Sequence, residues 1–278
     1  MILSRHMINR ILLGFISIAG SLGAQWLNYP TPGVPRTADG KPNLSAPAPK
    51  TADGKPDLSG IWQADDGRSL KPEERPSPSP FPQSRILRWI DFGWGLPGGL
   101  PYQPWAAEAV KRRKALNGRD DPTSAACLPL GVPRLLVDPE YRKIVQVPGL
   151  LLILNERNAG YRQIFTDGRP LPEDPQPNWN GYSSGKWEGD TLVVHTNGLR
   201  DGMWLDRAGS PMTDAAKLTE RFRRVNYGTL EIDVTVDDPK AYTKPWTVKV
   251  TEFIAVNTEL IDYICSENEK DASHLLGK

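Results

Sequence analysis

From residue 143 onward, apolar and polar residues alternate with a period of two, the pattern of strands that bury one face. Short segments rich in Gly, Pro, Asn and Asp interrupt this pattern at the spacing of hairpin turns. The predicted strands are 143–147, 150–156, 161–165, 191–196, 218–225, 230–236, 246–254 and 259–265, with another ending near Trp187. Strands joined by such short turns run antiparallel, because a parallel pair needs a crossover of about a dozen residues.

The series of strands predicts a mainly β fold. About eight to ten antiparallel strands with one apolar side bury that side most economically in an up-and-down barrel or a strongly curled sheet. The sequence predicts one convincing helix, over 104–116. Pro104 suits a first helical turn, and Trp105, Ala109, Arg112 and Leu116 fall on one face at helical spacing.

The N-terminal residues have the three parts of a secretory signal peptide. Two arginines precede an apolar run over 11–22, and small residues at 21 and 23 favour cleavage just before Ala24 or Gln25. The apolar run is shorter than the ~20 residues that span a bilayer, so we expect no stable membrane anchor. We therefore expect a signal peptide over 1–24 and a secreted or periplasmic protein.

Residues 25–57 predict an extended Pro- and Gly-rich arm, because they contain few large aliphatic residues to offset the entropy of ordering. A nonapeptide occurs twice in this part of the chain, as TADGKPNLS at 37–45 and TADGKPDLS at 51–59. The second copy runs directly into Gly60-Ile61-Trp62. We expect one folded domain over 58–278 that begins there.

The charge balance of the chain bears on its possible partners, and its cysteine content bears on a possible disulfide. Cleavage after residue 24 leaves 32 of the 34 Lys and Arg against 33 Asp and Glu. This balance argues against nucleic acid as a partner. Cys127 and Cys265 are the two cysteines of a chain that we expect in an oxidising compartment, so we expect a disulfide between them. Two buried free thiols are the alternative.

The start of the domain is similar to a known barrel family. Gly60-Ile61-Trp62, with Arg221, Arg223 and Arg224 on a late strand able to cover the indole, resembles the Gly-x-Trp floor of lipocalins and other calycins. A longer set of segments resembles a family of uncharacterised secreted bacterial proteins: TADGKPDLSGIW (51–62), CLPLGVPR (127–134), DGRPLP (167–172), GKWEGDTLVV (185–194), ERFRR (220–224) and YTKPW (242–246). The likeness covers nearly all of the mature chain, and it implies secretion and a β-rich body only.

Paired carboxylates are the best enzymatic candidates. A sugar-cleaving site needs two carboxyl groups that face one platform, and Asp206 and Glu220, with His195 as an added base, are the candidates. Alternation puts Glu220 on the same strand face as Arg224. That face either points to solvent, with Glu220 and Arg224 paired, or lines a polar cavity.

Two other chemistries have less support. Residues 181–185 match the Gly-x-Ser-x-Gly elbow around Ser183, with His274 as a formal base, but a strand and a hairpin follow instead of the helix that the elbow requires. Zinc needs three or four nitrogen or sulfur ligands, and His195 is the one well-placed imidazole. Asp237-Asp238 and Glu173-Asp174 are more simply solvated turns than calcium ligands. We therefore expect no metal and no cofactor.

Aromatic residues suggest a binding function instead. Trp179, Tyr182 and Trp204 fall in predicted loops and strand ends, where flat indole and phenol rings suit sugar rings or apolar ligands. We add Arg221 to this ligand-binding set, and we expect Trp62 to be structural and Trp204 functional. The sequence predicts a secreted barrel that binds a small apolar or saccharide ligand in its mouth. The alternatives are a hydrolase or lyase that acts on a sugar derivative, and an adhesion or assembly module.

Overall fold

The fold is given by a computed structural model, which describes residues 29–65, 87–265 and 267. The expected signal peptide over 1–24 lies outside these residues. In the described part of the chain, no helix is long and apolar enough to cross a membrane.

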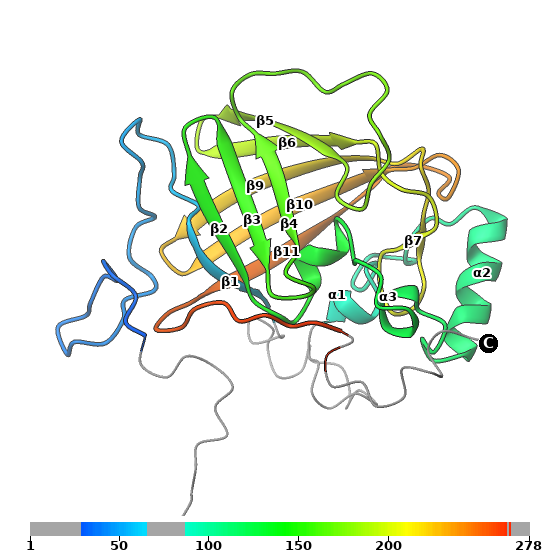
Figure 1. Ribbon diagram of the computed structural model, residues 1–278, viewed down its shortest axis with the longest axis horizontal. Coiled ribbons are helices and arrows are strands. Elements are labelled where there is room, and N and C mark those ends of the chain that lie inside the picture. Colours follow the sequence, from blue (N-terminus) through cyan, green and yellow to red (C-terminus); the bar gives the residue numbers. More distant parts are fainter. Residues whose placement is uncertain (1–28, 66–86, 266, 268–278) are drawn as a thin grey trace, which may run out of the picture.

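Nine strands close into a barrel in the order β1-β11-β10-β9-β6-β5-β4-β3-β2 (Figure 1). The strands are β1 (Gly60–Ala64), β2 (Arg142–Val147), β3 (Leu150–Asn155), β4 (Tyr161–Phe165), β5 (Tyr182–Glu188), β6 (Thr191–Asn197), β9 (Lys217–Asn226), β10 (Thr229–Asp237) and β11 (Trp246–Ala255). Two short strands, β7 (Met203–Trp204) and β8 (Pro211–Met212), pair separately. The prediction of a mainly β barrel is confirmed, and most predicted strand ends agree within a residue or two.

The barrel differs from a purely antiparallel one at one pair of strands. β4 and β5 run parallel, paired through Ile164↔Ser183 and Phe165↔Ser184. The connection over 166–181 is long enough for the crossover that a parallel pair needs. The predicted last strand over 259–265 is wrong, because β1 already pairs with both β11 and β2 and leaves no free edge.

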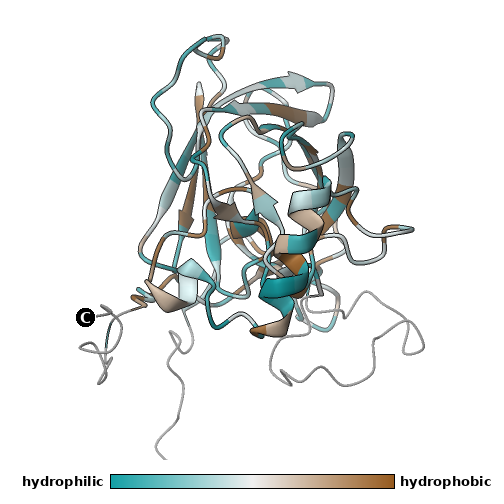
Figure 2. Ribbon diagram, turned by 90° about the vertical axis from the view of Figure 1, so that its right-hand side faces the viewer, coloured by the Kyte–Doolittle hydropathy of each residue, from teal (hydrophilic) through white to brown (hydrophobic). Residues whose placement is uncertain are grey.

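The predicted helix is present as α2 (Pro104–Ala115), but its buried face is different. Ala106, Ala109 and Val110 are buried, whereas Trp105 is 49% exposed and Leu116 is also exposed. The structure adds α1 (Leu87–Ile90), α3 (Pro122–Ala125) and a 3₁₀ helix, η2 (Arg134–Val137). These helices gather at one end of the barrel (Figure 1), and Figure 2 shows the molecule from that end. The teal colour on α2 in Figure 2 includes its basic segment over 111–114.

The first strand brings Trp62 into the barrel as a structural residue. Its indole is fully buried, and Nε1 donates a hydrogen bond to the Leu58 carbonyl at 3.0 Å. Gly60 allows this arrangement, because a Cβ at that position would lie 3.2 Å from Ile254 and 3.4 Å from the Trp62 ring nitrogen. The guanidinium carbon of Arg224 lies 4.9 Å from the Trp62 ring centroid.

The two nonapeptide copies form matching small hairpin loops. In the first, the Thr37 amide donates to the Lys41 carbonyl at 2.9 Å, and in the second, Thr51 donates to Lys55 at 2.8 Å. The glycine of each copy has positive φ (+80° and +78°), as expected after a type I turn in a three-residue hairpin loop. The arm is therefore ordered by its own backbone hydrogen bonds.

The arm also packs against the barrel rather than extending away from it. The amides of Tyr227 and Gly228, in the β9–β10 turn, donate to the Ala46 and Leu44 carbonyls at 2.7 and 2.8 Å. Figure 1 shows the arm, in blue, at the opposite end of the barrel from the helices.

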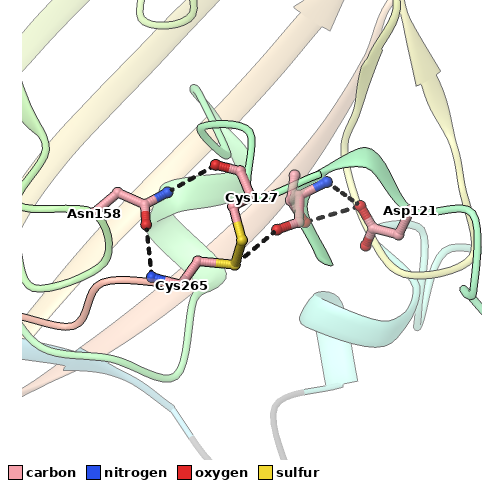
Figure 3. The surroundings of a disulfide bond; sticks show 5 residues. Asp121, Cys127, Asn158 and Cys265 are labelled. Atoms are coloured by element: carbon pink, nitrogen blue, oxygen red, sulfur yellow. Dashed lines mark hydrogen bonds between the residues drawn. A yellow bond between two sulfur atoms is a disulfide. The ribbon is translucent and has the colours of Figure 1, made fainter. Parts of the chain in front are cut away.

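The predicted disulfide between Cys127 and Cys265 is confirmed, with Cα atoms 5.5 Å apart. Asn158, in the β3–β4 turn, holds both partners, because its side chain donates to the Cys127 carbonyl (3.5 Å) and accepts from the Cys265 amide (3.2 Å; Figure 3). The bond therefore fastens the segment that follows β11 to the segment that follows α3.

Candidate functional site

A pocket of about 450 Å³ opens at the end of the barrel that carries the arm. The β2–β3 and β5–β6 hairpins turn at this end, and β4 ends there. The pocket is lined by Thr51, Ala52, Asp53, Gln146, Val147, Pro148, Gly149, Leu151, Thr166, Trp187 and Leu192. We call it the mouth pocket. It is mainly apolar and has a few polar groups, as small-molecule sites commonly do.

Strand alternation places the apolar wall of the mouth pocket. Successive inward positions on β5 are Ser183, Gly185 and Trp187, and Trp187 pairs with Leu192 across the hairpin. Leu151 and Leu192 are buried, whereas Trp187 is partly buried against the core and so keeps part of its ring accessible. The pocket therefore presents an indole above an aliphatic floor.

The arm supplies the rim on the other side. Gln146, on β2, accepts a hydrogen bond from the Leu58 amide (2.8 Å) and donates one to the Pro56 carbonyl (3.3 Å). The Gln146 side chain thus fixes residues 56–58, which directly follow the second nonapeptide loop. As a result, Thr51, Ala52 and Asp53 of that loop lie at the pocket. The duplicated sequence thus contributes to the site through its second copy.

The barrel interior beneath is filled, in part by buried charged groups. Arg162 of β4 donates to both carboxylate oxygens of Glu220 on β9, and also to the hydroxyls of Ser183 (3.1 Å) and Thr196 (3.0 Å). All four residues are buried. This network occupies part of the barrel interior, near the start of β4 and therefore at the end of that strand away from the mouth pocket.

A second buried pair joins the barrel to the helical end. Arg142 of β2 forms an ion pair with Glu252 of β11 and donates to the carbonyls of Leu136 (3.1 Å) and Asp138 (2.7 Å). Burial raises the pKa of Glu252, and Arg142 opposes that rise. The η2 segment is thereby held across this end of the barrel.

The predicted catalytic residues do not share a cavity. Glu220 is inside the barrel and pairs with Arg162, so it neither points to solvent nor pairs with Arg224. His195 is on the opposite face of the sheet, exposed, with Nδ1 3.1 Å from the Thr219 hydroxyl.

Asp206 lies apart from both, in the loop between β7 and β8. It is fully buried and accepts hydrogen bonds from the Phe92 amide (2.8 Å), the Ser210 amide (2.9 Å) and the Ser210 hydroxyl (2.6 Å). Burial raises the pKa of Asp206, and these hydrogen bonds oppose the rise. These contacts tie the α1 segment to the β7–β8 loop, so the carboxylate of Asp206 is engaged in holding the fold together.

Among the described residues, the structure shows neither a serine with a nearby base nor a cluster of metal ligands. Ser183 is buried within β5 and bonded to Arg162 and Thr196, while His274 lies outside the described residues. No group of three or more His, Cys, Asp or Glu among the residues described is placed to hold a metal ion. Asp238 is buried and accepts from the Thr213 amide and hydroxyl, both at 2.8 Å.

The predicted ligand-binding aromatics are also separated. Trp204, expected in an exposed loop, is 5% exposed and lies in β7, with Arg113 stacked 4.4 Å from its ring centroid. The expectation that Trp204 is exposed is therefore wrong, and an indole buried in this way has little surface for a ligand.

Trp179, Tyr182 and Arg221 have other surroundings. Trp179 is partly buried, with Arg200 5.3 Å from its ring centroid. Tyr182 stacks on Phe165 with the ring centroids 5.3 Å apart. Arg221 is on the outer face of β9, in an ion pair with Glu188 at 3.0 Å. None of these three residues lines the mouth pocket.

Trp187 lines the mouth pocket, although it is not among the ligand-binding residues that the sequence predicts. The signal was available, because residues 183, 185 and 187 alternate along one strand and 187 is the last inward position before the hairpin. An inward aromatic residue at a strand end stands at the opening of a barrel.

A smaller pocket of about 350 Å³ lies between the arm and the barrel, beside β1 and the end of β11. Lys143 and Glu259, which pair at 2.6 Å, line it together with Arg224, Tyr29 and Tyr227. Its charged groups are already engaged within the protein, since Arg224 donates to the carbonyls of Asp57, Ser59 and Tyr227. The mouth pocket is therefore the stronger candidate.

No protein-family model matches the sequence, and none of the curated proteins compared with it is detectably similar.

Proposed function

We propose that this protein is a secreted barrel protein that binds a small apolar or saccharide ligand in the mouth pocket. The observation that carries the proposal is the partly accessible indole of Trp187 at the opening of a closed barrel. The volume of the pocket falls within the range of about 300–1,000 Å³ that is usual for small-molecule sites.

The chemistry of the lining supports a ligand with one flat apolar face. An indole offers such a face to a sugar ring or to an aromatic ring, and Leu151 and Leu192 exclude water beneath it. Gln146 is engaged with the arm, and the Thr51 hydroxyl is engaged within its own loop, so the Thr166 hydroxyl and the Asp53 carboxylate are the polar groups that we assign to a ligand at the rim. A ligand of one or two rings with polar substituents fits this set.

Export and calycin kinship are parts of the same proposal. The signal-like sequence over 1–24 supports export, and a disulfide is a feature of oxidising compartments. The Gly60 and Trp62 arrangement, with Arg224 over the indole, supports kinship with the calycin barrels. N-terminal sequencing of protein recovered outside the cytoplasm tests export, and recovery of chains that begin at Met1 would count against it.

Ligand binding is tested on the mature chain with a library of neutral aromatic compounds and monosaccharides, by calorimetry. For any compound that binds, Trp187→Ala is expected to weaken affinity by about 5- to 150-fold, since stacking and burial on one aromatic ring contribute about 1–3 kcal/mol. Trp105→Ala is the matched control, because Trp105 is exposed at the helical end. A ligand whose affinity is unchanged in Trp187→Ala would remove the mouth pocket from consideration.

A further inference from the structure

The two nonapeptide loops have the same backbone hydrogen bonds, but their aspartates differ in ion pairing. In the first loop, Asp39 pairs with Lys41 at 2.8 Å. In the second, Asp53 accepts a hydrogen bond from the Thr51 hydroxyl but, among the residues the structure describes, has no ion-pair partner within 4.0 Å. Lys55, the counterpart of Lys41, is partly buried instead. The carboxylate of Asp53 is therefore exposed and forms no ion pair with a basic side chain of the described residues.

Asp53 is also the one charged residue among the described residues that line the mouth pocket. Two of the nearby basic residues form ion pairs with other carboxylates: Lys50 with Asp190 at 3.7 Å, and Arg169 with Asp167 at 2.5 Å. The side chains that line the pocket include no Lys, Arg or His. A ligand in the pocket thus meets an indole, an aliphatic floor and one carboxylate that forms no ion pair among the described residues.

We propose that Asp53 gives the mouth pocket a preference for ligands that carry a cationic amine beside an apolar ring, such as arylalkylamines. The inference rests on the proposed function, since it names the ligand class of that same site. The ring packs against Trp187 and Leu192, and the ammonium group donates a charge-assisted hydrogen bond to the Asp53 carboxylate. An anionic substituent is disfavoured at the same position.

Asp53 is suited to this role because it is ionised. The hydrogen bond from Thr51, together with the charge of Lys55, holds the pKa of Asp53 below its ordinary value. The same Lys55 charge also limits the attraction for a ligand cation. Because the rim is open to solvent, the gain is that of an exposed ion pair, about two- to fivefold in affinity at low salt. The gain should decrease as salt shortens the screening length.

The test compares three probes that share one ring: 2-phenylethylamine (cation), 2-phenylethanol (neutral) and 3-phenylpropanoate (anion). Calorimetry gives the dissociation constant of each at about 10 mM and about 1 M salt, where the screening length falls from about 30 Å to about 3 Å. The proteins are the wild-type mature chain, Asp53→Asn, and Asp39→Asn as the matched control from the first loop.

We expect the amine to bind about two- to fivefold more tightly than the alcohol, and the propanoate to bind least, in wild type and in Asp39→Asn at low salt. Asp53→Asn and high salt should each bring the amine-to-alcohol ratio to about one. A ratio that is one in wild type, or that persists in Asp53→Asn, overturns the inference but leaves the proposed function in place. If none of the probes, nor any compound of the neutral library, binds in a Trp187-dependent way, both are overturned.

Discussion

Arg224 lies over the indole of Trp62 and joins three parts of the chain that are far apart in sequence. Its guanidinium group is 4.9 Å from the ring centroid and donates to the carbonyls of Asp57, Ser59 and Tyr227. The side chain therefore holds the end of the arm, the start of β1 and the β9–β10 turn together. Burial lowers the pKa of Arg224, but an arginine remains charged at neutral pH.

We expect Arg224→Met to destabilise the protein by about 3 kcal/mol. The substitution keeps an unbranched apolar chain over Trp62 but leaves three carbonyls without their donor, and each buried carbonyl that is unsatisfied costs about 1–3 kcal/mol. Arg223→Met is the control, because Arg223 is exposed on the outer face and pairs with Glu231 there. Its effect should stay within about 1 kcal/mol. Urea unfolding of both variants measures the difference, and equal losses would contradict the assignment.

The burial of Trp204 changes what its removal should do. We expect both Trp62→Ala and Trp204→Ala to lower the free energy of unfolding by about 3–5 kcal/mol, as for other buried large aromatics. Thermal unfolding followed by circular dichroism checks this. If Trp204→Ala leaves the melting temperature unchanged, Trp204 is accessible in solution and its placement in β7 under Arg113 is wrong.

Loss of the disulfide should weaken the protein substantially. The bond closes a loop with a sequence separation of 138, for which the chain-entropy model gives on the order of 4–5 kcal/mol. We expect the Cys127→Ser, Cys265→Ser double variant to unfold at a lower urea concentration. Its free energy of unfolding should be lower than that of wild type by about 4–5 kcal/mol. The mass of the non-reduced wild-type protein after alkylation provides a direct check. Uptake of two alkyl groups would show two free thiols and would contradict the prediction.

The buried pair between Asp121 and Arg134 predicts a specific acid response. Burial tends to raise the pKa of Asp121, but the hydrogen bonds and charge of Arg134 lower it more, to a net value below the ordinary 3.8. A carboxyl with a depressed folded-state pKa contributes stability above its unfolded-state pKa, and that contribution is lost as the pH falls through the folded-state value. The pair should therefore stabilise the fold at neutral pH and cease to do so as the pH falls below about 4.

The Asp121→Asn variant tests the direction of this pH dependence of stability. At pH 7 we expect a loss of about 3–5 kcal/mol, because the substitution leaves Arg134 buried without its counter-charge. The difference from wild type should shrink as the pH falls below about 4. Asp120→Asn, at the exposed neighbouring position, should change little at any pH. A loss for Asp121→Asn that is independent of pH would show that ion pairing is not its cause.

Much of the barrel was predictable because strand alternation is a local property of the sequence. The hairpins through Pro148-Gly149 and Asn226-Tyr227-Gly228 have the composition of turns, and their strands were placed within a residue or two. The parallel pair of β4 and β5 was missed because parallel or antiparallel pairing depends on the path of the 166–181 connection, which has no periodic signal.

The site was harder to predict, because burial depends on residues distant in sequence. Trp204 is in a turn-rich segment, which suggests exposure, yet Arg113 of α2 covers it. Alternation correctly puts Glu220 on the same face of β9 as Arg224, but the ion-pair partner of Glu220 is Arg162, which comes from a different strand. Conversely, nothing local to residues 51–53 shows that one of two nearly identical loops lies at the mouth pocket.

The closure of the barrel by β1 has a consequence for how the chain is made. Ile61 pairs with Ala255 of β11, the last strand of the barrel to be synthesised, while Gly60 pairs with Ile144 of β2. A chain that grows from its N-terminus carries β1 for most of its synthesis without one of its two neighbours. Contacts between residues so distant in sequence also form slowly. The complete barrel is thus a product of the finished polypeptide, and a chain interrupted before Trp246 would expose the edges of both β1 and β10.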